Sequence, residues 1–405
     1  FHKVAPLFSN LPEAKQTVDI QPMEQFNQGW GTILYRTILP ETTLAGTTLK
    51  ITEVHDWAQI YADGKLLARL DRRKGEFATT LPALKKGTQL DILVEAMGRV
   101  NFDKSIHDRK GITEKVELIS GNQTKELKNW TVYNFPVDYS FIKDKKYSDT
   151  KILPTMPAYY KSTFTLDKVG DTFLDMSTWG KGMVWVNGHA MGRFWEIGPQ
   201  QTLFMPGCWL KEGENEILVL DLKGPTRASI KGLKKPILDV LREKAPETHR
   251  KDGEKLKLTG EKVAHEGAFT PGNGWQEVRF ATPVKGRYFC LEALSPQAND
   301  NIAAIAEFDV LGADGKPVSR EHWKIRYADS EETRSGNRTA DKIFDLQEST
   351  FWMTVDNVPY PHQLVIDLSK VENVTGFRYL PRAEKGYPGM IKEYRVYVKP
   401  ADFNY

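Results

Sequence analysis

The chain is dominated by short segments in which apolar and polar residues alternate, and this pattern restricts its fold more than any other feature. Examples are GTILYRTIL (31–39), QLDILVEAMG (89–98) and YYKSTFTL (159–166). Side chains of a β-strand point alternately to opposite faces, so the alternation predicts half-buried strands. Gly, Asn, Asp and Pro separate the segments at intervals of about 8 to 12 residues, which is typical of β-sandwiches. We therefore expect an all-β protein.

Two dipeptides predict tight hairpins within this pattern. Asp63-Gly64 divides the segment 48–70, and Asn187-Gly188 follows MVWV (183–186). Asn, Asp and Gly tolerate positive φ, which a type I′ turn needs at both central positions. Alternation along MVWV is expected to place its two valines on one face of the strand and Met and Trp on the other.

The stretch WGKGMVWVNGHAMGRFW (179–195) is dense in tryptophan and glycine, and it fits either a ligand site or a structural hairpin. His189 has no second histidine, cysteine or carboxylate at ligand spacing nearby, which disfavours metal binding. Arg193 and Trp195 either contact a ligand or brace the hairpin against a neighbouring domain. Because turn and strand signals account for most of its residues, we favour the structural hairpin.

Composition sets broad limits on function. With 405 residues the chain is long enough for about three domains. Lys and Arg number 56 against 53 Asp and Glu, a balance that gives no support for nucleic-acid or anionic-membrane binding. No apolar run is long enough for a membrane span, and two cysteines define no disulfide framework. The chain starts at Phe1 without a signal peptide, so we expect a piece of a longer protein.

The strand segments fall into three blocks, which predict three β-sandwiches in series. We expect the first sandwich at 15–120, the second at 121–230 and the third at 258–405. Between the last two lies a basic linker, 231–257, which we expect to pack on its neighbours. PILDVLREKA (236–245) is expected to form a short helix there. A basic binding patch is the alternative interpretation of this linker.

The stretch WGKGMVWVNGHAMGRFWEIGPQQTLFMPGCWL (179–210) resembles a motif of β-galactosidases of glycoside hydrolase family 35. There it marks a galactose-binding-like jelly roll behind the catalytic barrel. Met191 and Phe194 replace the usual Leu and Tyr. GWGTILYRTIL, VHDWAQIYADGK, LDILVEAMGRVNF and DRKGI match the preceding β-domain of the same family. The resemblance runs from about residue 20 to 225 and assigns the first two blocks to these two domain types.

This resemblance also implies what the chain lacks. Glycoside hydrolysis needs two carboxylates that flank the scissile bond, and in this family they are glutamates on an eight-stranded α/β barrel that precedes the β-domains. No part of this sequence alternates strand and helix in that way. We therefore assign no catalytic residue and expect the chain alone to be inactive. Phe102 matches an aromatic residue that, in relatives, lies near the sugar pocket of the barrel; a packing role between domains is the alternative.

The third block resembles the discoidin-like, coagulation factor 5/8 type C domain. The resemblance rests on TADKIFDLQESTFW (339–352), PHQLVIDLSKVENVTGFRYLPR (361–382) and GMIKEYRVYVK (389–399). The family's Asp-Gly turn reads Asp345-Leu346 here. Segments that match the closing strands (276–312) precede those that match the opening strands (323–399). We favour a circularly permuted domain, because two half-domains would leave unpaired strand edges.

The discoidin-like resemblance implies two kinds of site. A structural calcium would bind Asp345, Thr350 and Glu307 together with carbonyls near Lys342; a plain polar loop is the alternative. Carbohydrate would bind aromatic rings, with Arg382 as a hydrogen-bond donor. The aromatic candidates are Trp275, Trp323, Trp352, Tyr360 and Tyr387.

We therefore expect a non-catalytic C-terminal region of a periplasmic or secreted β-galactosidase. Its partners would be an upstream catalytic barrel and galactose-containing glycans, with no nucleic acid, no membrane span and no cofactor beyond a structural calcium. A stand-alone lectin-like protein and a purely structural array of sandwiches are the alternatives.

Overall fold

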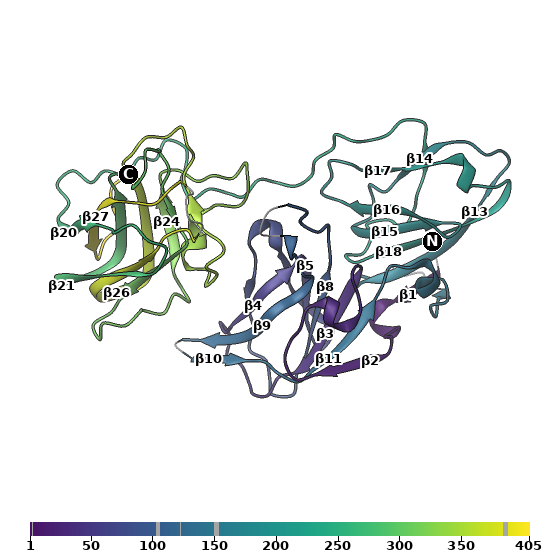
Figure 1. Ribbon diagram of the computed structural model, residues 1–405, viewed down its shortest axis with the longest axis horizontal. Helices are drawn as coiled ribbons and strands as arrows, with labels where there is room; N and C mark the ends of the chain where they lie inside the picture. The colour runs from purple at the N-terminus through teal and green to yellow at the C-terminus, as the bar shows by residue number, and fades with distance from the viewer. Residues whose placement is uncertain (2, 103–105, 122, 150–153, 384–387) are drawn as a thin grey trace.

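The protein is described by a computed structural model that covers residues 1, 3–102, 106–121, 123–149, 154–383 and 388–405. Nearly all regular structure in these residues is β-strand, so the all-β prediction is confirmed. The strands form galactose-binding-like sandwich domains in series, with the C-terminal domain set apart at the end of a long connection (Figure 1).

The first sandwich packs a six-stranded sheet on a four-stranded sheet. The six-stranded sheet has the order β2 (Ala14–Thr17), β11 (Trp130–Phe135), β3 (Thr32–Ile38), β8 (Gln89–Glu95), β5 (Trp57–Ala62) and β6 (Lys65–Asp71). The four-stranded sheet has the order β10 (Gln123–Glu126), β9 (Gly111–Ser120), β4 (Thr48–His55) and β7 (Ala78–Thr80). Two 3₁₀ turns, η2 (Met23–Phe26) and η3 (Arg72–Lys74), join strands. The chain crosses from one sheet to the other at Asp56, between β4 and β5.

The second sandwich packs a six-stranded sheet on a three-stranded sheet. The larger sheet has the order β12 (Ser148–Asp149), β1 (Lys3–Pro6), β13 (Ala158–Leu166), β18 (Gly213–Asp221), β15 (Lys181–Val186) and β16 (His189–Trp195). The smaller sheet has the order β17 (Thr202–Met205), β14 (Thr172–Asp175) and β19 (Gly232–Leu233). The short helices are η1 (Leu7–Ser9), α1 (Tyr139–Ile142) and η5 (Gly207–Trp209).

Strand pairing moves the boundary that we expected at residue 120. β11 pairs with β2 and β3 and so belongs to the first sandwich. The N-terminal β1 pairs with β13 and so belongs to the second. A strand's own pattern does not tell which sheet it joins, which is why the expected ranges 15–120 and 121–230 were wrong at these ends.

Both predicted hairpin turns are present. Asp63 and Gly64 have φ values of 46° and 79°, and Asn187 and Gly188 have 48° and 85°. Two consecutive positive φ values are the signature of a type I′ turn, whose twist matches that of the strands it joins.

One apolar core is shared by the first two sandwiches. Met183 and Trp185 of β15 pack in it with Trp57 and Tyr61 of β5. The intervening valines of β15 face the core of the second sandwich instead. The predicted alternation is therefore confirmed, but both faces of this strand are buried. The two six-stranded sheets thus pack face to face.

A hydrogen bond and an aromatic contact also connect the first two sandwiches. Arg193 donates from Nη2 to the carbonyl oxygen of Ala96 at 2.5 Å. Trp195 packs edge-on against Trp57, with ring centroids 6.5 Å apart. Both side chains therefore brace the hairpin against the first sandwich, which was one of the two roles that the sequence left open.

The linker packs on the second sandwich without forming the predicted helix. Residues 236–246 form neither helix nor strand. The amides of Val240 and Arg242 donate to the carbonyls of Pro199 and Ile197 at 3.0 and 2.7 Å. These backbone groups already have partners in a neighbouring loop, so a helix over PILDVLREKA would break those bonds.

The third sandwich forms around a six-stranded sheet. The order is β20 (Val263–Ala268), β27 (Glu393–Lys399), β21 (Gln276–Ala293), β26 (His362–Leu380) and β23 (Glu307–Leu311), and β24 (Lys324–Ala328) also pairs with β26. A two-stranded sheet, β22 (Ala304–Ile305) with β25 (Trp352–Met353), and η6 (Ala340–Phe344) complete it. β21 lies between β27 and β26, so the segments 276–312 and 323–399 form one domain and not two halves. That their order is a circular permutation stays a prediction.

The buried pair of Lys181 and Glu95 offers a test of the junction between the first two sandwiches. Both side chains are nearly inaccessible, and the Lys181 ammonium bonds the Glu95 carboxylate. Burial lowers the pKa of Lys181, although Glu95 opposes that shift. We predict that Glu95→Leu alone destabilises the junction by about 3 kcal/mol, because it leaves a buried charge without a partner.

The double variant Glu95→Leu/Lys181→Met should recover most of this loss. Scanning calorimetry of the wild type, the two single variants and the double variant measures the coupling energy between Glu95 and Lys181. Equal, additive losses in the two single variants would contradict a direct pairing.

Candidate functional site

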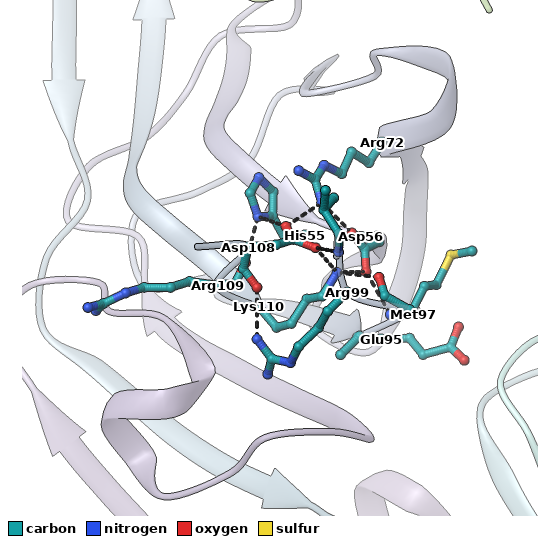
Figure 2. A network of polar contacts seen from close by, with 12 residues as sticks. His55, Asp56, Arg72, Glu95, Met97, Arg99, Asp108, Arg109 and Lys110 are labelled. Carbon is teal, nitrogen blue, oxygen red and sulfur yellow. Dashed lines mark hydrogen bonds and ion pairs between the residues drawn. The ribbon is translucent and has the colours of Figure 1, made fainter. Parts of the chain in front are cut away.

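Four charged side chains meet in the first sandwich where the chain changes sheets (Figure 2). Asp56 lies at the crossing from β4 to β5, and Arg72 is the first residue of η3. Asp108 and Lys110 end the loop that leads into β9. We call Asp56, Arg72, Asp108 and Lys110 the ionic cluster.

The ionic cluster is closely bonded and balanced in charge. The Lys110 ammonium, which has no exposed surface, donates to Asp56 Oδ2 at 2.7 Å and lies 2.8 Å from Asp108 Oδ2. Arg72 Nη1 donates to Asp56 Oδ1 at 2.8 Å and to Asp108 Oδ1 at 2.7 Å. Two cations thus neutralise two carboxylates, which is the condition under which buried charges are tolerated.

The same carboxylates hold the backbone of the loop that follows β8. The amide of Met97 donates to Asp56 Oδ2 at 2.6 Å, and the amide of Val100 donates to Asp108 Oδ2 at 3.1 Å. Arg99 donates to the carbonyls of Asp108 and Gly29 at 2.8 and 2.6 Å. The loop is therefore fixed at both ends by charge-assisted hydrogen bonds.

Apolar side chains on this fixed loop face solvent. Phe102 is 80% exposed and Ile106 is 59% exposed. Val100 and Trp30 are also exposed, and Trp30 follows the glycine that Arg99 binds. We call Trp30, Val100, Phe102 and Ile106 the loop patch. Large apolar residues that are exposed near one another are candidates for a docking or ligand surface, and Val100, Phe102 and Ile106 belong to one loop.

The Asp108 carboxylate of the ionic cluster is not suited to act as a general acid. Burial raises the pKa of Asp108, but hydrogen bonds from Lys110 and Arg72 outweigh burial and lower it to about 2. The general acid of a glycosidase must hold a proton near neutral pH, which requires a raised pKa. This carboxylate stays ionised and so cannot be that acid; its contacts, to two cations and to the Val100 amide, support the loop.

The structure corrects one of the sugar-binding candidates in the third sandwich. Trp352 is 1% exposed, packs in the domain core and donates from its indole Nε1 to the Ser330 carbonyl at 3.0 Å. A ring buried in this way has no face left for a sugar, so this prediction was wrong. Tyr360 packs against the same core, and its hydroxyl donates to the Ile302 carbonyl at 2.6 Å.

Two other candidates lie on adjoining loops. Trp275 is exposed on one side and stacks on the Arg378 guanidinium, which lies 4.5 Å from the ring centroid. Arg382 stacks on Phe351 in the same way at 4.3 Å. Asn273 Nδ2 donates to the Ala383 carbonyl at 3.3 Å, which brings the two loops together. Tyr387 lies outside the described residues, and Phe102 belongs to the first sandwich.

The three candidate calcium ligands gather at the start of β23 and the end of η6. Thr350 Oγ1 donates to Asp345 Oδ2 at 2.7 Å. Burial raises the pKa of Asp345 to about 7 against the opposing effect of Lys342, and raises that of Glu307 to about 8 against Arg320. Glu307 Oε1 is buried and accepts no hydrogen bond from the described residues. The buried Glu307 carboxylate, which is paired with Arg320, and the partly buried Asp345 carboxylate, which lies 3.9 Å from Lys342 Nζ, are oxygen ligands of the type that a hard cation prefers.

Side chains alone would not complete such a site. Within the described ranges, no group of three or more His, Cys, Asp or Glu side chains is placed to hold a metal ion. Backbone carbonyls would have to supply the remaining oxygens, as the sequence interpretation also required. The described part of the chain also contains no helix with the length and apolarity that a membrane crossing requires.

Sequence reasoning missed the ionic cluster. Its members are ordinary charged residues spread from Asp56 to Lys110, and nothing in their spacing marks them as partners. A signal was present in DRKGI (108–112), where Asp108 and Lys110 alternate directly before a strand. Their burial depends on the sheet crossing at Asp56, which the strand pattern did not reveal.

Removing the charge of Asp108 should release the loop. We predict that Asp108→Asn lowers the stability of the first sandwich by about 3 kcal/mol at pH 7, because Lys110 and Arg72 lose a buried partner. The pKa of Asp108 is depressed in the folded state, so its contribution is present above the unfolded value near 4 and is lost as pH falls toward 2. Urea unfolding at pH 7 and at lower pH measures this difference between wild type and variant.

Glu41→Ala, which removes an exposed partner of Lys125, provides the matched control and should change stability by less than about 1 kcal/mol. A difference for Asp108→Asn that stays constant down to pH 2 would contradict the assignment.

Comparison with known proteins agrees with the domain order. Residues 21–136 match the family model "Beta-galactosidase, first all-beta domain", 157–215 match "Beta-galactosidase, galactose-binding domain", and 327–405 match "F5/8 type C domain".

Relatives with similar sequences are β-galactosidases or are named after them. Human beta-galactosidase-1-like protein 2 is 35% identical over 205 residues, which cover 49% of this chain and 30% of the relative. Bovine beta-galactosidase is 35% identical over 255 residues, 55% of this chain and 37% of the relative. Among solved structures, a lectin from Pleurotus ostreatus aligns with 57% of this chain and 84% of its own, at 10% identity and a TM-score of 0.20. The chain spans about a third of the length of the curated relatives it matches, and it carries, in series, the first all-beta and galactose-binding domains of β-galactosidases and an F5/8 type C domain.

Proposed function

We propose that this chain is the non-catalytic accessory region of a β-galactosidase. In this proposal the first two sandwiches hold the loop patch against the catalytic part of the parent protein, which hydrolyses terminal β-galactosides. The third sandwich holds galactose-containing glycans close to that catalytic part. Attachment of this kind raises the effective concentration of cleavable bonds.

The proposal that this region docks on the catalytic part rests on the loop patch, whose loop is bonded to the ionic cluster. Phe102 and Ile106 are among the most exposed apolar side chains of the described residues, yet the loop that bears them is bonded to buried charges. Burial of an apolar side chain contributes about 1.5–3 kcal/mol, and a pre-ordered loop loses little entropy on docking. A stand-alone lectin would have no use for such a surface, so we rank that alternative second.

The relatives support the kind of parent protein that we propose. Bovine and Dictyostelium discoideum proteins that are 35% and 31% identical to this chain over 255 and 246 residues are named beta-galactosidase and beta-galactosidase 1, and the matched part covers 37% and 35% of their length. A periplasmic or secreted location belongs to the same proposal, because enzymes that degrade polysaccharides meet their substrates outside the cytoplasm.

The loop patch can be tested in the full-length parent protein. We predict that Phe102→Ser/Ile106→Ser weakens the contact with the catalytic part by about 3 kcal/mol, since two apolar side chains no longer leave water. The parent should then hydrolyse a chromogenic β-galactoside with at least tenfold lower kcat/KM or unfold in two separate calorimetric transitions.

Val18→Ser, which alters an exposed apolar residue of the same sandwich, is the control and should leave both properties unchanged. The isolated chain with the double substitution should fold normally, because both side chains already face water there. Unchanged activity and unfolding of the double variant would refute docking through the loop patch.

We also propose that the third sandwich binds a structural calcium through Asp345, Thr350 and Glu307. The support is the raised pKa values of Asp345 and Glu307, together with Glu307 Oε1, which accepts no hydrogen bond from the residues that the structure describes. A bound cation would supply the positive charge that these carboxylates lack, and it would order the turn after η6.

Calcium should therefore stabilise the isolated chain. We predict that calcium at about a hundredfold its Kd adds about 3 kcal/mol to the stability of the third sandwich, seen as a higher melting temperature. Asp345→Asn should abolish the effect, and Asp314→Asn, on an exposed turn of the same domain, should preserve it. No response of the wild type to calcium, or an equal response of the Asp345 variant, would exclude this site.

A further inference from the structure

The second sandwich contains a cavity of about 630 Å³ between its two sheets. Strands β13 and β18 of the larger sheet form one wall, and β14, β17 and β19 of the smaller sheet form the other. The cavity shares no lining residue with the loop patch or with the candidate sites of the third sandwich. Small-molecule sites usually measure about 300–1,000 Å³, so this cavity is large enough for a ligand.

Strand alternation explains why this space is left open. Ser162 and Phe164 point to the same face of β13, and Phe164 packs against the core of the sandwich. The short side chain of Ser162 leaves a gap on that face, beside its cross-strand partner Ile217 of β18. On the smaller sheet, Gly232 of β19 pairs with Leu174 of β14 and adds no side chain. Each wall therefore contains a small residue where a large one would fill the space.

The lining offers apolar surface that a ligand can reach. Phe164, Leu166, Leu210 and Ile230 line the cavity and are only partly buried. Val169, in the loop between β13 and β14, is 38% exposed, so the cavity is accessible from solvent at this loop. Water in an apolar hollow finds few hydrogen-bond partners, and its replacement by an apolar group is favourable.

The two charged residues of the lining do not favour a charged ligand. Lys168 and Asp171 are exposed and opposite in charge, and Asp171 Oδ1 already accepts from the Gly207 amide at 2.7 Å. An ion that entered the cavity would lose its hydration, and the apolar walls would not replace it. The lining therefore selects a neutral ligand whose buried part is an aliphatic chain or an apolar ring.

We propose that the cavity between the sheets of the second sandwich binds a neutral small molecule through an aliphatic chain or apolar ring. Phe164, Leu210 and Ile230 contact this apolar part, and the small side chain of Ser162 provides the space for it. The site is independent of the proposed function, because it requires neither the catalytic part nor a galactose-containing glycan.

The test uses the complete chain and the probe N-phenylnaphthylamine, whose fluorescence rises when it leaves water. We expect saturable binding and displacement of the probe by hexanol, octanol and decanol. The affinity of the alcohols should rise about fourfold with each added CH₂ group, because each group is removed from water. Octanoate should displace the probe more weakly than octanol, since its carboxylate would lose hydration.

Two variants place the site, and a third is the control. Ser162→Leu fills the space from β13 and should abolish probe binding without lowering the melting temperature, because the new side chain meets apolar neighbours. Ile230→Ser, in the loop before β19, removes apolar contact and should weaken octanol binding about tenfold. Thr165→Leu changes an exposed residue on the opposite face of β13 and should bind the probe as the wild type does.

The outcomes are distinct from those of the proposed function. Probe binding that survives both Ser162→Leu and Ile230→Ser would overturn the site, and Ile230→Ser decides alone if Ser162→Leu fails to fold. Tighter binding of octanoate than of octanol would overturn the neutral class. No saturable binding of the probe or of any alcohol by the wild type would overturn the whole inference, while docking and glycan binding would stand or fall by their own tests.

Discussion

The apolar core shared by the two six-stranded sheets is the constraint on which the rest of the structure depends. Trp57 and Tyr61 from one sheet and Met183 and Trp185 from the other lose their access to water together. Strands β5 and β15 are buried on both faces as a result. The first two sandwiches therefore form one unit, and a surface on either is presented with the rigidity of both.

The ionic cluster extends this rigidity to the edge of the unit. Buried charge generally contributes little to stability once desolvation is included, so its value here lies in fixing geometry. Asp56 and Asp108 each accept bonds from cations and from loop amides, which couples the sheet crossing to the loop after β8. The third sandwich contacts this region through Glu53, which lies three residues before Asp56 in the chain. The Glu53 carboxylate accepts hydrogen bonds from Ser349 of the third sandwich and from His55.

Much of the fold could be predicted because alternation and turn chemistry are local. The Asp63-Gly64 and Asn187-Gly188 turns have the expected positive φ values, and the two faces of β15 divide as alternation requires. Pairing between distant strands is not local, so the alternation of apolar and polar residues could not predict which sheets β1 and β11 join. The helix expected over PILDVLREKA is absent for a similar reason: its backbone bonds to the loop 197–201, which is distant in sequence.

The candidate sites were less predictable than the fold, because burial decides the role of each side chain. Trp352 and Trp323 look equivalent in the sequence and both pack in the domain core, yet the Trp352 indole donates to a carbonyl, whereas the Trp323 indole has no hydrogen-bond partner among the described residues. Asp108 is buried and Asp345 is partly buried, and their pKa values shift in opposite directions: hydrogen bonds from Lys110 and Arg72 lower that of Asp108, whereas desolvation raises that of Asp345. These differences arise from neighbours that only the folded chain brings together.

The central claim is that a loop anchored through Met97, Val100 and Asp108 presents apolar side chains to a catalytic part of the parent protein. Hydrogen exchange of residues 98–112, compared between this chain and the full-length parent, tests it most directly. The account predicts slow exchange of the Val100 amide in both, together with protection of Phe102 and Ile106 side chains from radical labelling in the parent alone. Equal labelling of these two side chains in chain and parent would contradict it.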